Sequence, residues 1–202
     1  AIHLPMTIEL LTALASFCLA SSITPGPNNL MLMASGANFG FLKTTPHLLG
    51  VGFGFMLMVF LVGIGLAQLF DNYPIAHAIL KVVSVAYLLY LAWKIANAAP
   101  ISAADSQGTP MRFLQAAAFQ WVNPKAWTIA VTAVTVYAPD TNLISILIVS
   151  AMFGLINLPS ISLWVVLGQQ MARILTNPKR LRLFNWTMAA MLIGSLYPVL
   201  WP

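Results

Sequence analysis

Charged residues are scarce in this chain. Only 6% of its 202 residues are Asp, Glu, Lys or Arg, whereas 60% are hydrophobic. A soluble domain of this size keeps roughly a quarter of its residues charged, because its surface must face water. The composition therefore excludes an ordinary soluble protein and indicates that lipid surrounds most of the chain.

Cysteine and acidic residues are also rare. The single cysteine, Cys18, excludes an internal disulfide, a CxxC redox pair and a thiolate metal cluster, and we expect it to be buried and unreactive. The four carboxylates lie at the ends of apolar segments or between them: Glu9, Asp71, Asp105 and Asp140. We therefore expect no metal ion or other cofactor. We also expect no carboxylate at the bilayer centre, where a cationic substrate or a carboxylate proton relay would need one.

Long apolar segments make up most of the chain. About six of them reach the roughly 20 residues that a helix needs to cross the hydrocarbon. They lie at about 8–39, 46–70, 74–96, 113–137, 142–172 and 183–201. The sequence thus predicts an all-α integral membrane protein that forms a single domain over 1–202 in the lipid bilayer. We expect residues 1–5 to be an addition before a natural start at Met6.

Basic residues are unevenly distributed between these segments. The first, third and fifth polar connections hold nearly all of them: Lys43, Lys94, Arg112, Arg173, Lys179, Arg180 and Arg182. The termini and the fourth connection hold none, and Lys81 is the one basic residue near the second. The positive-inside rule then places connections one, three and five in the cytoplasm and both termini in the periplasm. This pattern explains the pI of about 9.7 without a nucleic-acid partner.

The longest polar connection, 97–112, divides the chain into halves of about three spans each. An odd number of spans per half brings the second half into the membrane from the opposite side, as in an inverted-topology repeat. The halves share the placement of their helix breakers rather than their sequence. We predict six transmembrane helices arranged as two inverted three-helix repeats, with helices one, four and five broken.

The first break is Pro25-Gly26-Pro27, followed by Asn28 and Asn29. Two prolines remove two backbone donors and glycine loosens the chain, so a regular helix cannot continue here. Inside the membrane, the freed backbone groups need protein or water as partners. The next half-helix begins near the asparagines, and its partly positive N-terminus suits a substrate carboxylate. A kink used only for packing is the alternative.

The fourth predicted span contains a matching break, with Gln120 before it and Asn123-Pro124-Lys125 across it. Lys125 lies near the middle of the span, too deep for its side chain to extend fully to water. A buried cation in a span is costly and usually marks a functional pathway. It can pair with an anionic ligand, take part in proton movement, or satisfy the carbonyl groups that the proline frees.

Asn157 and Pro159 lie at the centre of the fifth predicted span. They form either a third wall of the same cavity or an ordinary kink. Since no carboxylate is central, the predicted cavity is apolar, lined by amides and mildly positive. Such a cavity suits a small neutral zwitterion or a monoanion.

Other unusual residues in the spans favour packing or interfacial roles. His47 and His77 lie near span ends, so we expect interfacial or loop positions for them. Tyr90 and Trp93 resemble an interfacial aromatic belt with Lys94 as its anchor. Glycines at a spacing of two in the second span favour close helix packing: Gly50, Gly52 and Gly54.

Three segments resemble a known family: SITPGPNNLML at 22–32, AYLLYLAWKI at 86–95 and FQWVNPKAW at 119–127. The chain is similar, over essentially its whole length, to the lysine-exporter and homoserine-exporter (LysE/RhtB) family of bacterial amino-acid translocators. The resemblance implies export of amino acids or close derivatives across the bacterial inner membrane, driven by the proton gradient or by exchange. By motif position it carries over Pro25, Gly26, Pro27, Asn28, Gln120, Asn123, Pro124 and Lys125.

The chain most resembles the branch with neutral substrates such as cysteine, O-acetylserine, threonine, homoserine or leucine. Our leading hypothesis is a secondary exporter that holds the substrate carboxylate at Asn28 and Asn29, with Lys125 as counter-charge. A passive channel for small solutes and an intramembrane enzyme are the alternatives. The enzyme is less favoured because the sequence has no GxSxG-like element and no central histidine. The small and aromatic residues of the spans are compatible with a homodimer.

Overall fold

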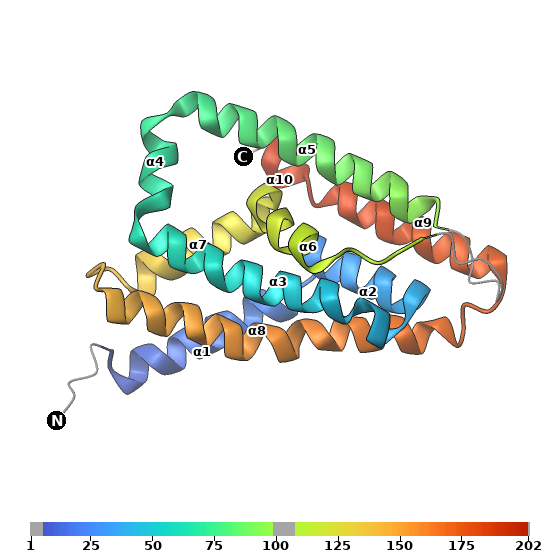
Figure 1. The fold of residues 1–202 in the computed structure, drawn as a ribbon, viewed down its shortest axis with the longest axis horizontal. Helices are drawn as coiled ribbons and strands as arrows, with labels where there is room; N and C mark the ends of the chain where they lie inside the picture. The colour runs from blue at the N-terminus through green and yellow to red at the C-terminus, as the bar shows by residue number, and fades with distance from the viewer. Residues whose placement is uncertain (1–5, 99–107, 202) are drawn as a thin grey trace.

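The computed structural model describes residues 6–98 and 108–201, and almost all of them are helical (Figure 1). The predicted addition at 1–5 and the centre of the long polar connection lie outside this part of the chain. The helices are α1 (Ile8–Ile23), α2 (Pro27–Phe39), α3 (Phe41–Leu61), α4 (Ala67–Asn72), α5 (Pro74–Ala96), α6 (Phe113–Phe119), α7 (Pro124–Tyr137), α8 (Leu143–Ala172), α9 (Pro178–Gly194) and α10 (Tyr197–Leu200). A π-helical turn (Val62–Leu66) joins α3 to α4, and a 3-10 turn (Gln120–Val122) follows α6.

Several of these segments are long and apolar enough to cross a membrane. Four qualify alone, namely Phe41–Asn72, Pro74–Ala96, Leu143–Ala172 and Pro178–Leu200. The pair α1 and α2 adds a fifth if it is one span bent by 52°. The expected span 113–137 consists of the short helices α6 and α7, and neither reaches this length. The protein is therefore a multi-pass membrane protein, while the number six and the inverted repeat stay predictions.

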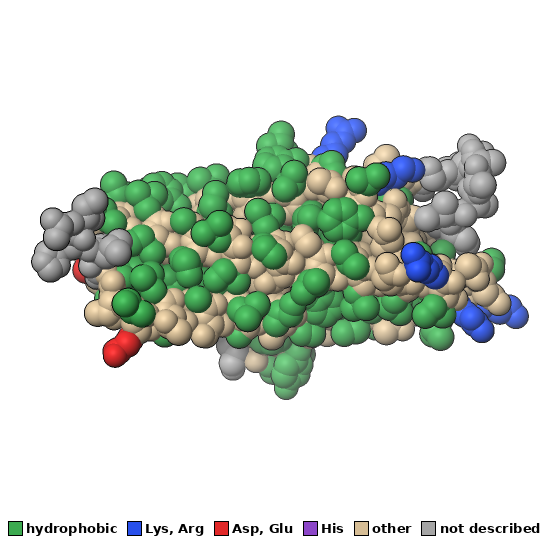
Figure 2. All heavy atoms as spheres, turned by 90° about the horizontal axis from the view of Figure 1, so that it is seen from below, with side chains coloured by type: hydrophobic (Ala, Val, Ile, Leu, Met, Phe, Trp, Pro, Cys, Tyr) green, Lys and Arg blue, Asp and Glu red, His purple; other side chains and the backbone are tan. Residues whose placement is uncertain are grey.

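The surface of the molecule suits lipid. Large apolar side chains are widely exposed on it, for example Leu114 at 76% and Leu155 at 71%. In water such a surface would drive aggregation, whereas in a bilayer it faces hydrocarbon. Figure 2 shows apolar side chains covering one long face, with Lys and Arg in one half and acidic side chains at the opposite end.

We call the end that carries most of the Lys and Arg residues the basic end. It is the end at which α2 turns into α3, α5 stops, and α8 passes into α9 (Figure 1). The basic residues in or next to these connections are Lys43, Lys94, Arg173, Lys179, Arg180 and Arg182.

The predicted breaks in spans one and four are confirmed. The first helix ends at Ile23 and the next begins at Pro27, while Asn123 separates the 3-10 turn from α7 at Pro124. In both cases a proline takes the first position of the second helix, where its missing N–H costs no helical hydrogen bond. The breaks therefore follow directly from local proline chemistry.

The predicted break in span five is wrong. Helix α8 runs without interruption from Leu143 to Ala172 and contains Pro159. Pro159 removes a single backbone hydrogen bond, the one to the carbonyl oxygen of Leu155. The hydrogen bonds of the turns before and after it remain, and α8 stays a continuous helix along the molecule.

The first polar connection is shorter than the sequence predicts. Gly40 alone separates α2 from α3, so Pro46 lies inside α3 rather than before it. Gly40 has φ 80°, a left-handed conformation that glycine adopts without steric cost. Because the turn needs only this residue, the segment after it continues directly as helix.

Helix α8 packs against α1, α2 and α3, and it approaches α2 most closely through two glycines. A Cβ atom on Gly168 would lie 2.0 Å from the carbonyl oxygen of Met33, and one on Gly36 would lie 2.3 Å from that of Val165. Small residues let two membrane helices bring their backbones together in this way. This contact fixes α2, and therefore the first break, against the longest helix.

A second pair of glycines joins α3 to α6. Gly50 and Gly54 lie four residues apart on one face, and Cβ atoms there would meet the Phe113 carbonyl oxygen at 2.3 Å and the Ala117 Cα at 2.5 Å. Gly52 faces α8 instead. The predicted packing role of these glycines is confirmed.

We expect Gly168→Ala to lower the free energy of unfolding by about 1–3 kcal/mol, because the added methyl group must push α2 and α8 apart. Thermal unfolding of the purified protein in detergent measures this change. The control is Gly194→Ala, since nothing lies within 4 Å of a Cβ at that position. Equal melting temperatures for the two variants would contradict the proposed close contact.

Candidate functional site

The two broken helices meet at Lys125. Its Nζ donates to the carbonyl oxygen of Thr24 at 2.9 Å, to the Thr24 hydroxyl at 2.9 Å and to the carbonyl oxygen of Pro25 at 3.1 Å. These carbonyl groups lie at the end of α1, where the backbone has left the helix and where a positive charge is favourable. In this structure the lysine therefore satisfies free carbonyl groups of the first break, rather than the carbonyl groups freed by Pro124 beside it, as predicted for one of its roles.

A pair of side-chain amides forms a second link between the breaks. Asn28 Nδ2 donates to Gln120 Oε1 at 2.8 Å, and Gln120 Nε2 donates back to Asn28 Oδ1 at 3.0 Å. Gln120 is fully buried, and its Nε2 also donates to the Ala116 carbonyl oxygen at 3.0 Å. The pair connects the N-terminus of α2 with the 3-10 turn that precedes α7.

Asn29, in the first turn of α2, donates hydrogen bonds across the first break to the end of α1. Its Nδ2 donates to the carbonyl oxygens of Ser22 at 2.7 Å and Thr24 at 2.8 Å, so it caps the end of α1 from the next helix. The side chain is buried, and its Oδ1 has no hydrogen-bond partner among the described residues. Asn29 thus keeps one free acceptor beside the break.

Asn123 has the corresponding position in the second break. It is buried, and its Oδ1 accepts from the backbone N–H of Lys125 at 3.2 Å, as the residue before a helix commonly does. This contact starts α7 and fixes the backbone from which the lysine side chain extends. Asn123 is therefore a positioning residue in this structure.

A small cavity lies between the breaks and α8. Its volume of about 40 Å³ is lined by Ser21, Ser22, Gly26, Asn28, Asn29, Phe55, Asn123, Lys125, Ala126, Ile129, Asn157 and Ile161. A buried water occupies roughly 10–15 Å³ of such volume, so the space holds a few waters but no amino acid. The breaks are in close contact in this conformation.

Of the remaining predicted site residues, Asn157 lines this cavity and the prolines do not. Asn157 is buried and lines it from α8, as predicted for a third wall. Pro159, two residues later, is exposed and does not line it. Among the residues of the breaks, Pro25 is exposed, while Pro27 and Pro124 shape the backbone from outside the lining.

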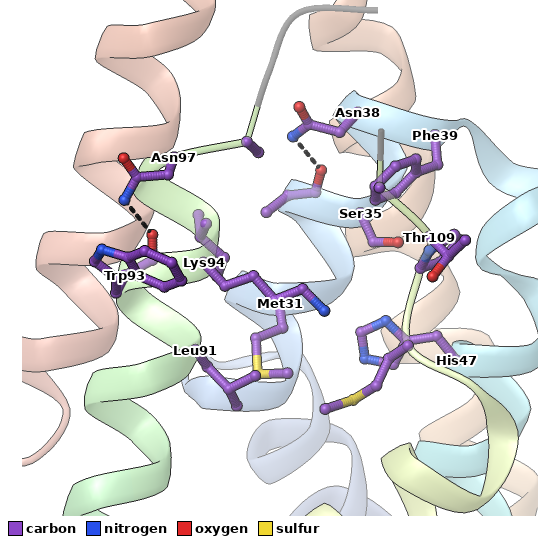
Figure 3. A pocket seen from close by; sticks show the side chains of 16 residues that line it. Met31, Ser35, Asn38, Phe39, His47, Leu91, Trp93, Lys94, Asn97 and Thr109 are labelled. Carbon is purple, nitrogen blue, oxygen red and sulfur yellow. Dashed lines mark hydrogen bonds between the residues drawn. The ribbon is translucent and has the colours of Figure 1, made fainter. Parts of the chain in front are cut away.

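Sequence reasoning missed a larger cavity near the basic end (Figure 3). It has a volume of about 280 Å³ and lies between α2, α3, α5 and the segment that leads into α6. We call it the basic-end cavity, and its lining is Met31, Ala34, Ser35, Asn38, Phe39, His47, Leu91, Trp93, Lys94, Ile95, Asn97, Ala98, Gly108, Thr109, Pro110 and Met111.

Of the two positions expected for His47, an interface or a loop, the loop is wrong. The ring lines this cavity and is only 2% exposed, because α3 begins at Phe41 and places His47 on a helical face toward α2. Thr44, one turn earlier, lies on the same side and pairs with the Ser35 hydroxyl at 2.8 Å. A second span that begins at Phe41, as α3 does, would have placed His47 on the same helical face as Thr44 by spacing alone.

Gln120→Leu should lower the free energy of unfolding by about 1–3 kcal/mol, because the half-buried Asn28 amide loses both of its hydrogen bonds to Gln120. The double variant Asn28→Leu/Gln120→Leu should recover part of that loss. Denaturant unfolding in detergent measures both variants. Gln170→Leu, an exposed position on α8, is the matched control, and strictly additive single effects would contradict the pairing.

Comparison with known proteins identifies relatives. A family model described as LysE type translocator matches residues 19–195, which include both breaks. The cysteine/O-acetylserine efflux protein of Escherichia coli (strain K12) is 32% identical over 172 residues, covering 84% of this chain and 87% of that protein. Proteins of the same name from Shigella sonnei (strain Ss046) and Shigella flexneri serotype 5b (strain 8401) match equally. No solved structure matches the chain.

These matches agree with the apolar surface and the multiple spans. They confirm the family resemblance of the two break motifs, and the family and the relatives consist of transport proteins. They also exclude the intramembrane enzyme. The chain is therefore a membrane transporter that belongs to the LysE type translocator family.

Proposed function

We propose that this protein is a secondary exporter of small neutral amino acids or their derivatives across the bacterial inner membrane. The contact of Lys125 with the end of α1 carries the proposal, because it places a half-buried cation beside a free helix N-terminus. The curated relatives named above are cysteine/O-acetylserine efflux proteins, which supports this substrate class. Threonine, homoserine and leucine belong to the same class of neutral zwitterions.

The substrate carboxylate would bind between Lys125 and the N-terminus of α2. The first N–H groups of any helix lack an acceptor within that helix, and here they belong to Asn28 and Asn29. A carboxylate forms stronger hydrogen bonds with an ammonium group than carbonyl oxygens do. Lys125 would therefore exchange Thr24 and Pro25 for the substrate, with Asn157 on the opposite wall.

Transport would proceed by alternating access. The Lys125 and Asn28–Gln120 contacts both join a residue before the long polar connection to one after it. Rocking of the two halves must break these contacts, so they define the state in which the site is closed. A passive channel would need a path that stays open, which such tight contact between the breaks disfavours.

Charge distribution supports an orientation for this exporter. Since Lys and Arg gather at the basic end, that end would lie in the cytoplasm and both termini in the periplasm. Proton antiport or substrate exchange would drive export. Lys125 is the candidate for coupling because none of the described carboxylates, Glu9, Asp71 and Asp140, lines the cavity between the breaks.

Counterflow of radiolabelled O-acetylserine and cysteine in proteoliposomes should be saturable, first at equal pH and then faster with an imposed pH gradient. Absence of flux for every neutral amino acid, in vesicles that contain folded protein, would contradict the proposal. A counterflow rate that does not change with the imposed pH gradient would favour substrate exchange over proton antiport.

Lys125→Met should reduce this counterflow more than about tenfold, because a charge-assisted contact with the carboxylate is lost. Lys81→Met removes an exposed lysine of α5 and should transport like the unmodified protein. Gel filtration must show that both variants remain folded. Full activity of Lys125→Met would exclude its role in substrate binding or coupling.

A further inference from the structure

We propose that the basic-end cavity is a loading site, which binds the carboxylate of a small zwitterion between Lys94 and His47 before it reaches the breaks. This inference rests on the proposed export function and adds a second binding site to it. The residues that form this site come from α2, α3 and α5, and neither Lys94 nor His47 belongs to the breaks.

His47 is the main evidence for a ligand. The side chain is 2% exposed, and neither ring nitrogen has a hydrogen-bond partner among the described residues. Buried polar groups are almost always paired, and an unpaired one usually indicates water, an ion or a functional role. Figure 3 shows the ring at the wall of the cavity. Both ring nitrogens are closed to solvent in this conformation, so the ring must turn toward the cavity before one of them donates to a bound carboxylate.

Lys94 supplies the positive charge. Figure 3 shows its side chain extending from α5 into the cavity, rather than standing away from it as a simple interfacial anchor would. The described lining contains no Asp, Glu or Arg. An anionic ligand in the cavity would form a charge-assisted hydrogen bond with this ammonium group.

Asn38 provides an acceptor for the other end of a zwitterion. It lines the cavity, and its Nδ2 already donates to the carbonyl oxygen of Ala34 and to Asn185 Oδ1. Its own Oδ1 is buried and lacks a partner within the described part of the chain. This oxygen is closed to solvent in this conformation, so the side chain must shift before it accepts a hydrogen bond from the ammonium group of an amino acid. A simple anion has no such donor and would leave it unpaired.

The size and lining of the cavity select a small ligand. Pockets for drug-sized molecules commonly measure about 300–1,000 Å³, and this cavity holds about 280 Å³. Met31, Leu91 and Trp93 make part of its wall apolar, which suits a short uncharged side chain. An amino acid of the class proposed above fits this combination better than a nucleotide or a peptide does.

Helix α2 connects the cavity to the breaks. Its first turn carries Asn28, and its later turns carry Met31, Ser35 and Asn38 at the cavity wall. At 1.5 Å per residue, Asn28 and Ser35 are about 10 Å apart along the helix. A ligand loaded from the basic end would therefore travel only this short distance to reach Lys125.

A cysteine placed in the cavity tests the inference at that position. Cys18 is the only native cysteine, so Cys18→Ala/Ser35→Cys gives a single reporter on the wall of the cavity. We expect O-acetylserine to slow modification of this cysteine by a methanethiosulfonate reagent in purified protein. O-acetylserine methyl ester, which lacks the carboxylate, should give no protection.

Adding Lys94→Met or His47→Leu should raise the half-protecting concentration of O-acetylserine about tenfold, and His47→Gln should restore part of the protection. Lys81→Met and His77→Leu are the matched controls at exposed positions and should change nothing. Lys94 is exposed, so its variant keeps the test valid even if His47→Leu fails to fold.

Two outcomes would overturn the inference. Unchanged protection in Lys94→Met, or equal protection by the ester, would exclude a carboxylate site in this cavity, while counterflow by the unmodified protein would leave the export function standing. If the unmodified protein neither transports O-acetylserine nor is protected by it, both the export function and the loading site are wrong.

Discussion

Freed backbone carbonyl groups at the end of α1 are the constraint on which the rest of the structure depends. Inside a bilayer they cannot bond to water from the lipid side, so the protein must supply donors. Asn29 supplies one from the helix that follows, and Lys125 supplies another from the opposite half of the chain. The second break therefore lies against the first, because Lys125 satisfies carbonyl groups there. The close glycine contacts between α2 and α8 stabilise this arrangement.

The parts of the site that depend on local chemistry could be predicted from the sequence. Proline removes a donor wherever it occurs, so both breaks and the half-helices that start at Pro27 and Pro124 follow from the residues themselves. The depth of Lys125 in the membrane stays a prediction, since neither α6 nor α7 is long enough to span it. The partners of Lys125 could not be predicted, because Thr24 lies 101 residues away in sequence and only the fold brings the two together.

Errors arose where tertiary contacts decide the outcome. Pro25 and Pro27 remove two donors within three residues and separate α1 from α2, whereas Pro159 removes one donor and leaves α8 intact. The sequence predicts a helix start at Pro46, which leaves His47 at the end of a span, yet Gly40 makes the turn alone and α3 begins at Phe41. The basic-end cavity could not be predicted either, because only the fold brings α2, α3, α5 and the segment before α6 together around it.

The central claim is that the contact between the two breaks must open during each transport cycle. The most direct measurement uses the triple variant Cys18→Ala/Asn28→Cys/Gln120→Cys. Its counterflow is measured before and after the two new cysteines are joined by a short, reducible cross-linker. The account predicts that the cross-link forms readily, since the Asn28 and Gln120 side chains lie within 3.0 Å of each other, and that it stops counterflow until it is reduced. Unchanged counterflow through the cross-linked protein would contradict the account.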